Sequence, residues 1–241
     1  MKLTSKQSQV YDLLLMPIIC DKSSPIIFIE DNKIISGQKY LGFADEDMSD
    51  FTLGFYEIIY KNILEDSRIL DDDGACYNID FSGDTMNSFN SIANTVEEAG
   101  NSVKTRNVFS QWPAFLQEYY LHYHCLANFW MVPARIGRQS KKLNYYDSVD
   151  IFLNQLEKDY EIMSCYTDYI SKVPDFDTFL RLHFVNTGRK DILSLYENKS
   201  GEKLVKHVVD DIHDRAYKIA TSPYANELWQ YFNMLHLVVT V

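Results

Sequence analysis

In a chain whose formal net charge is −11, residues 124–142 contain several basic side chains and no acidic ones. The basic residues are Arg135, Arg138, Lys141 and Lys142. Pro133 and Gly137 predict that the backbone bends near the arginines, as a loop does. A guanidinium group offers a planar fork of donors that matches a phosphate or a carboxylate, so the stretch predicts an anion site. The alternative is that the arginines pair with acidic residues elsewhere on the surface, where such pairs contribute little stability.

A second polar region, residues 81–95, is rich in asparagine and serine. If Asp84 caps a helix here, one face of that helix is polar and almost uncharged. This face comprises Asp84, Asn87, Ser91 and Asn94. Solvated helix faces are normally rich in Lys and Glu, whereas Asn and Ser compete with the helix backbone for hydrogen bonds. The composition therefore favours a buried face that binds a ligand or neighbouring backbone, and the alternative is an irregular loop.

Together the two regions predict one polar pocket for an anionic small molecule or for an acidic group of a protein partner. The predicted lining residues are Asp84, Asn87, Asn90, Asn94, His124, Asn128, Arg135 and Arg138. The first functional hypothesis is therefore a binding or regulatory module.

Two groups of residues that contain histidine raise the question of a metal site. His122 and His124 are two residues apart, but a helix would point them in different directions, and no second cluster at ligand spacing accompanies them. His207, Asp211 and Asp214 share one side of an expected helix, opposite its apolar face. We expect that side to be a solvated acidic surface. Neither a metal ion nor a cofactor is expected in this protein.

An enzyme is the alternative function. A nuclease-like phosphodiesterase could use His124 as general base and the arginines to stabilise charge in the transition state. The sequence contains no nucleophile elbow, no P-loop and no dinucleotide-binding glycine pattern, so it leaves open whether the protein is an enzyme. A structural subunit or a phage-related interaction protein is a third possibility, which an exposed aromatic patch would favour.

Helices are the elements that must position these groups, because apolar residues recur at helical spacing along most of the chain. The expected helices cover approximately residues 51–64, 112–123, 147–163, 174–184, 204–219 and 222–235. Residues 26–36 contain two β-rich runs around Asp31 and Asn32, which predict a hairpin. The expected fold class is mainly α (α+β): a single compact helical domain, residues 1–241, with a small N-terminal β-hairpin.

The amino-acid composition limits the partners that we expect the protein to bind and the cellular compartment in which we expect it. The chain of 241 residues is 46% hydrophobic, which is enough to bury a substantial core, and it has no apolar run of membrane-spanning length. Its negative net charge disfavours nonspecific binding to nucleic acid or to an anionic membrane. The four cysteines lie far apart without a CxxC pair, as is typical of free thiols in a reducing cytosol, so we expect a cytoplasmic protein.

Several segments resemble a bacterial family of uncharacterised cytoplasmic proteins, a domain of unknown function. The segments, within residues 51–184, are "FTLGFYEIIYKNI", "DTMNSFNSIAN", "YHCLANFWMVPARIGR" and "FLRLHF". This resemblance implies a shared fold and no established activity. The sequence "HCLANFWMVPARIG", followed by Leu143 and Asn144, is also similar to the Gly-Asn-Leu segment of HNH-type restriction nucleases. The chain departs from that family at Ala127, where the family has Gly, and it lacks the family's upstream water-activating His.

Overall fold

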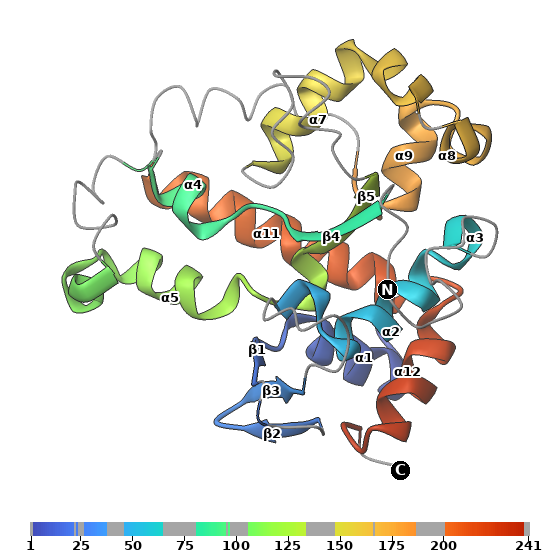
Figure 1. Cartoon of the computed structure of the whole chain (residues 1–241). Coiled ribbons are helices and arrows are strands. Elements are labelled where there is room, and N and C mark those ends of the chain that lie inside the picture. The colour runs from blue at the N-terminus through green and yellow to red at the C-terminus, as the bar shows by residue number, and fades with distance from the viewer. Residues whose placement is uncertain are drawn as a thin grey trace. The chain divides into compact units, whose positions relative to one another are not determined.

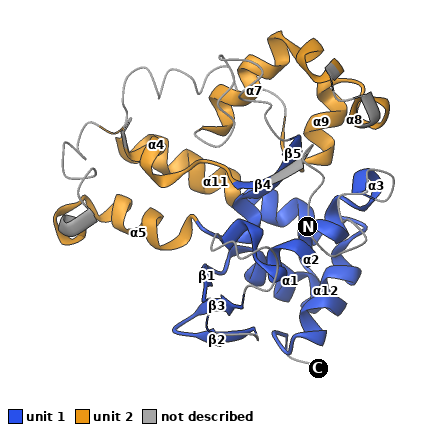
Figure 2. Ribbon diagram, in the orientation of Figure 1, with its two compact units in different colours: residues 1–84, 124–134, 213–241 blue, residues 85–123, 135–212 orange. Residues whose placement is uncertain are grey.

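The structure, a computed structural model, describes residues 2–21, 23, 27–37, 46–64, 81–94, 96, 106–133, 148–165, 167–186 and 201–238 (Figure 1). Helices dominate these residues and the strands are short, so the prediction of a mainly α fold of the α+β type is confirmed. Within the same residues, no helix is long and apolar enough to cross a membrane. The chain divides into two compact units, each built from separate stretches of sequence (Figure 2). The organisation as one domain stays a prediction.

Unit 1 contains residues 1–84, 124–134 and 213–241. Its elements are helix α1 (Ser5–Leu15), strands β1 (Ile18–Cys20), β2 (Phe28–Glu30) and β3 (Lys33–Ser36), the 3-10 helix η1 (Glu46–Met48), helices α2 (Asp50–Ile59) and α3 (Lys61–Leu64), most of strand β4 (Phe81–Thr85), the 3-10 helix η4 (Leu126–Asn128), strand β5 (Phe129–Pro133) and helix α12 (Ala225–Met234). Helix α1 begins with a capping box, in which Thr4 and Gln7 each accept a hydrogen bond from the other's main-chain N–H. Helix α12 packs against both α1 and α2.

A three-stranded sheet in the order β1-β3-β2 also belongs to unit 1. Strands β2 and β3 form the hairpin that the sequence predicts. Asp31 and Asn32 connect them with φ values of 48° and 58°, as the two central residues of a type I′ turn require. Strand β1 pairs in parallel with β3 and places Ile18 opposite Ile34. Both isoleucines are buried, so this row of the sheet contributes to the core of unit 1.

Unit 2 contains residues 85–123 and 135–212. Its elements are helix α4 (Phe89–Asn94), the 3-10 helix η3 (Arg106–Gln111), helices α5 (Ala114–His122) and α7 (Val149–Lys158), the 3-10 helix η5 (Tyr160–Cys165), and helices α8 (Thr167–Lys172) and α9 (Phe176–Leu182). Helix α11 (Gly201–Ala220) contributes residues 201–212 to unit 2 and its other residues to unit 1. The ring centre of Phe89 lies 4.9 Å from that of Trp112 and 6.0 Å from that of Tyr119, so aromatic side chains form part of this unit's core.

A buried arginine, Arg215, holds η4 and β5 in unit 1. Its guanidinium Nη1 donates to the main-chain carbonyls of Ala127 at 2.7 Å and Leu126 at 3.2 Å, and its Nη2 donates to the Tyr60 hydroxyl at 3.2 Å. The guanidinium carbon also lies 5.4 Å from the centre of the Trp130 ring, a cation–π geometry. The segment that follows His124 is therefore fixed from inside the core of this unit.

The structure corrects the prediction for residues 81–95. Asp84 does not cap a helix, because it lies in strand β4, which pairs with β5, and α4 begins only at Phe89. Asn87, between these two elements, has a φ of 53°. A left-handed residue cannot continue a right-handed helix, so the polar face expected from Asp84 to Asn94 is not a single helix face.

Candidate functional site

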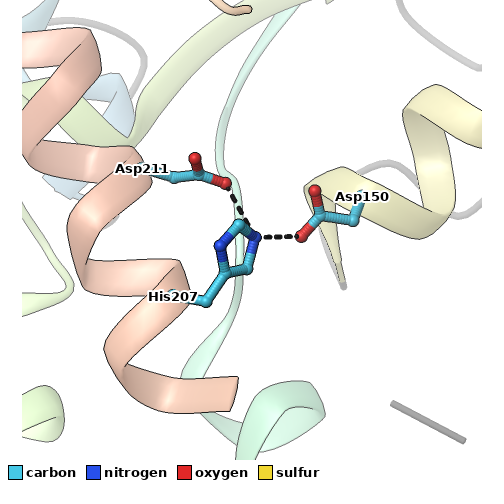
Figure 3. A group of neighbouring side chains, drawn as sticks. All are labelled: Asp150, His207 and Asp211. Carbon is cyan, nitrogen blue, oxygen red and sulfur yellow. Dashed lines mark hydrogen bonds and ion pairs between the residues drawn. The ribbon is translucent and has the colours of Figure 1, made fainter. Parts of the chain in front are cut away.

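Three side chains of unit 2 that can bind a metal ion or exchange a proton lie together: Asp150, His207 and Asp211 (Figure 3). The Nε2 atom of His207 lies 3.0 Å from Oδ2 of Asp150 and 3.1 Å from Oδ2 of Asp211. One ring nitrogen therefore faces two carboxylates. The three ligand atoms all lie within 4.8 Å of one another.

Helical spacing places two of these groups. His207 and Asp211 are four residues apart on α11, so they are neighbours on the surface of this helix, beside the buried Val208 and Ile212. The expectation of a solvated face is wrong here, since the side chains of His207 and Asp211 are only 17% and 22% exposed. Helix α7 contributes Asp150, 1% exposed, to the same place.

Asp214 does not join this cluster. Its carboxylate is 40% exposed and pairs with the Lys218 ammonium group at 3.0 Å, one helical turn further along α11. The solvated acidic surface that the sequence predicts is therefore present at Asp214 and not at His207.

The position of Asp150 depends on how α7 begins. Ser148 precedes the helix, but its side chain makes no cap hydrogen bond. Instead, the side-chain Oδ1 of Asn87 accepts a hydrogen bond from the Val149 N–H at 2.9 Å. A residue that the sequence predicts as a ligand contact thus caps the first turn of α7. The positive end of the helix dipole in this turn stabilises the Asp150 carboxylate.

The two carboxylates determine the charge of the imidazole. Burial by itself would lower the pKa of His207, but hydrogen bonds to Asp150 and Asp211 and the negative charges of these residues raise the pKa to about 9. The imidazole is therefore protonated at neutral pH in the metal-free protein. Its contacts join helix α11 to helix α7 within unit 2.

The same three groups fit a divalent metal ion. Imidazole nitrogens and carboxylate oxygens bind zinc at about 2.0–2.2 Å, so two such atoms lie about 3.3–3.6 Å apart on a tetrahedral ion and about 2.8–3.1 Å apart at a right angle on a five- or six-coordinate ion. The separations of 3.0 and 3.1 Å around His207 match the right-angle spacing. An ion would replace the proton on Nε2 and reduce the repulsion between the carboxylates. Three protein ligands would leave further positions on the ion open to water or to an oxygen of a bound molecule.

The structure assigns the residues of the predicted anion pocket to different units. Three of them belong to unit 1: Asp84, His124 and Asn128. Three belong to unit 2: Asn87, Asn90 and Asn94. The two arginines that complete the pocket, Arg135 and Arg138, lie outside the described residues. The common pocket therefore stays a prediction.

The described residues of this set have different environments. Asn87 and Asn128 are buried, whereas Asn90 is exposed on α4. Asp84 is half-buried in β4, and Asn94 is the last residue of α4. Among these residues, Asn87 accepts a hydrogen bond on its side chain from Val149, the residue before Asp150.

His124 lies half-buried in unit 1 beside a carboxylate. Its Nδ1 is 3.6 Å from Oε2 of Glu46, and its ring meets the ring of Phe129 edge-on, with 6.0 Å between the ring centres. Its main-chain carbonyl accepts a hydrogen bond from the Ile18 N–H at 2.9 Å. The imidazole therefore has an acidic neighbour as well as an apolar one.

Asp150 is the member of the cluster that the sequence does not indicate. His207 and Asp211 carry a recognisable signal, because residues four apart share a helix face. Asp150 has no such signal, since an acidic residue in the first turn of a helix is common and is explained by the helix dipole. The contact with His207 joins residues 57 positions apart and is visible only in the folded unit.

Comparison with family models, curated proteins and solved structures finds no match to this sequence. The resemblances to a bacterial family of uncharacterised proteins and to HNH-type nucleases therefore stay predictions.

Proposed function

We propose that this protein is a binding module whose centre, formed by Asp150, His207 and Asp211 in unit 2, holds a divalent metal ion. The observation that supports this function is one imidazole nitrogen placed 3.0 and 3.1 Å from oxygens of two aspartates. With a protonated imidazole the three side chains together carry a negative charge in a largely buried place, which is costly. A divalent cation in the place of the proton makes the group of three neutral.

The donor set defines the class of ion. One imidazole nitrogen and two carboxylate oxygens suit zinc, manganese, cobalt or nickel, whereas calcium takes six to eight oxygen ligands. The open positions on such an ion attract anionic oxygen donors. The anionic small molecule or acidic partner group that the sequence predicts would bind there, through a phosphate or carboxylate oxygen.

The proposal is tested by isothermal titration calorimetry of the full chain with Zn²⁺, Mn²⁺ and Co²⁺, and with Ca²⁺ for comparison. The wild type should bind one transition-metal ion per chain. His207→Gln and Asp150→Asn should each lose more affinity than the roughly 10–100-fold that loss of an outer partner costs. His122→Gln is the matched control, because His122 is an exposed histidine of the same unit outside the cluster.

Wild-type affinity in both cluster variants would refute the proposal, as would a wild type that binds none of these ions. Asp150→Asn keeps the size and an accepting oxygen of the side chain. Circular dichroism of this variant is the check that it folds. Titrating the protein with inorganic phosphate, with and without the metal ion, then tests whether the bound ion holds an anionic ligand. Phosphate should bind only in the presence of the ion, and equal binding without it would show that the ion does not hold the anion.

A nuclease-like phosphodiesterase with His124 as general base is the second candidate function, and the nearby Glu46 carboxylate favours it. A carboxylate beside an imidazole can orient it and stabilise its protonated form. Hydrolysis of bis(p-nitrophenyl) phosphate should then decline in both His124→Ala and Glu46→Gln and persist in His122→Ala. A wild type without hydrolytic activity in the presence of Mg²⁺ or Mn²⁺ would rule this function out.

A further inference from the structure

Asn87 belongs to the segment between β4 and α4, yet its polar groups connect it with two other elements of unit 2. Its side-chain Oδ1 accepts from the N–H of Val149, the first residue of α7, and its main-chain carbonyl accepts from the Tyr119 hydroxyl. Asn87 and Tyr119 are both buried. These bonds fix both the main chain and the side chain of Asn87.

We propose that Asn87 is a positioning residue, an inference that rests on the proposed metal centre. By holding Asp150 in place, Asn87 sets the affinity and the coordination geometry of the bound ion. The first N–H groups of a helix have no partner within the helix, and the residue before the helix normally supplies one. The Ser148 side chain makes no such bond. The first turn of α7 is therefore held from outside by Asn87, and Asp150 is the second residue of that turn.

The consequence for the ion follows from the distances. A carboxylate contributes to a metal site only if its oxygen stays close to the other ligand atoms, and the Asp150 oxygen is 3.0 Å from Nε2 of His207. Without the bond from Asn87 the first turn loses a cap, and the Asp150 oxygen is no longer held at this distance. The ion then keeps His207 and Asp211, which share one helix, and loses a fixed third ligand.

Two substitutions distinguish the loss of the cap hydrogen bond from a change in the backbone conformation at position 87. Asn87→Gly removes the accepting oxygen but tolerates the positive φ of this position. Asn87→Asp keeps an accepting oxygen. The matched control is Asp175→Ala, since Asp175 caps α9 of the same unit by accepting from the Thr178 N–H at 2.7 Å. Asn87→Gly and Asp175→Ala should each lower Tm by about 2–4 °C, because each removes one helix cap.

The readouts are the affinity for Co²⁺ and the visible absorption spectrum of the bound Co²⁺, measured on the full chain. Asn87→Gly should weaken binding by about 10–100-fold and change the spectrum, because an outer residue that orients a ligand has an effect of this size. Asn87→Asp should restore the wild-type spectrum, and Asp175→Ala should bind Co²⁺ as the wild type does.

The outcomes distinguish this inference from the function on which it rests. A wild type that binds no Co²⁺ refutes the metal centre itself. A wild type that binds Co²⁺, together with an Asn87→Gly variant of equal affinity and spectrum, refutes the role of Asn87 and leaves the metal centre standing. An equal loss of affinity in Asp175→Ala would show that the effect of Asn87 is one of general stability, which also refutes its positioning role.

Discussion

The buried guanidinium group of Arg215 donates a hydrogen bond of 2.7 Å to the main-chain carbonyl of Ala127. Arg215→Ala would remove the donor of this carbonyl in the core, whereas the Leu126 carbonyl would keep its bond from the Phe129 N–H, and it would open a cavity beside Trp130. We expect the free energy of unfolding to fall by about 3 kcal/mol or more. Tyr60→Phe, which removes one bond to the same group, should cost about 1 kcal/mol. Urea denaturation measures both, and equal losses in the two variants would contradict this account.

Gly83→Ala should destabilise the protein more than Gly54→Ala. A Cβ atom at Gly83 would lie 2.7 Å from the Tyr56 ring and 2.8 Å from the main-chain oxygen of Asp47, which cannot rotate away. At Gly54 the Cβ atom would meet the hydroxyl end of the Tyr231 side chain, and alanine also has the higher helix propensity in α2. We expect a loss of about 1–3 kcal/mol for Gly83→Ala and a smaller one for Gly54→Ala. Thermal unfolding of the two variants side by side checks this order, and the reverse order would contradict it.

The stability of the metal-free protein should depend on pH through His207. Its pKa is raised from 6.5 to about 9 in the folded protein, so its contribution to stability is fully present below pH 6.5 and is lost as the pH rises through 9. The free energy of unfolding should therefore fall by up to about 3 kcal/mol between these values. Urea denaturation in the presence of a chelator, from pH 6 to 9.5, measures this fall. The His207→Gln variant should lack this pH-dependent fall in stability. A variant with the same pH profile as the wild type would disprove the contribution of His207.

Cys125 should react slowly with iodoacetamide in the folded protein. Burial raises the pKa of its thiol to about 12, although hydrogen bonds from the N–H groups of Asn128 and Ala127 act in the opposite direction. Cys20 is only partly buried. Alkylation followed by peptide mass spectrometry should show labelling of Cys125 at least about 100-fold slower than that of Cys20, because the thiolate is the reactive form. In urea the two rates should converge, and similar rates in the native protein would contradict the burial of Cys125.

Local patterns in the sequence predict several of the helices and the hairpin, although helix α1 (Ser5–Leu15) is not among the expected elements. The apolar repeat between residues 204 and 219 predicts a helix that the structure shows as α11, Gly201–Ala220. The β-rich runs around Asp31 and Asn32 predict the hairpin of β2 and β3. Both depend on interactions between residues close together in the chain, and therefore they can be inferred without the tertiary structure.

Predictions that depend on distant contacts are less successful. Asp84 follows the pattern of a helix cap, but pairing of β4 with β5 places it in a strand. His207 lies on the polar side of α11, but it is only 17% exposed there and contacts Asp150 of α7. Arg215 has the sequence context of an ordinary helix residue, and its burial follows from the packing of η4 and β5 around it. In each case the side chain's environment is decided by a partner tens of residues away.

The cap on α7 also has a consequence for the order of folding. Asn87 and Val149 are 62 positions apart, and Asp150 and His207 are 57 positions apart. Two long loops must close before the carboxylate and the imidazole can meet, and loop closure carries an entropic cost that local helix formation does not. A collapsed intermediate with all of its helices formed would still lack the centre. The kinetics with which a refolding chain captures an ion would therefore report the arrival of native topology rather than the formation of helices.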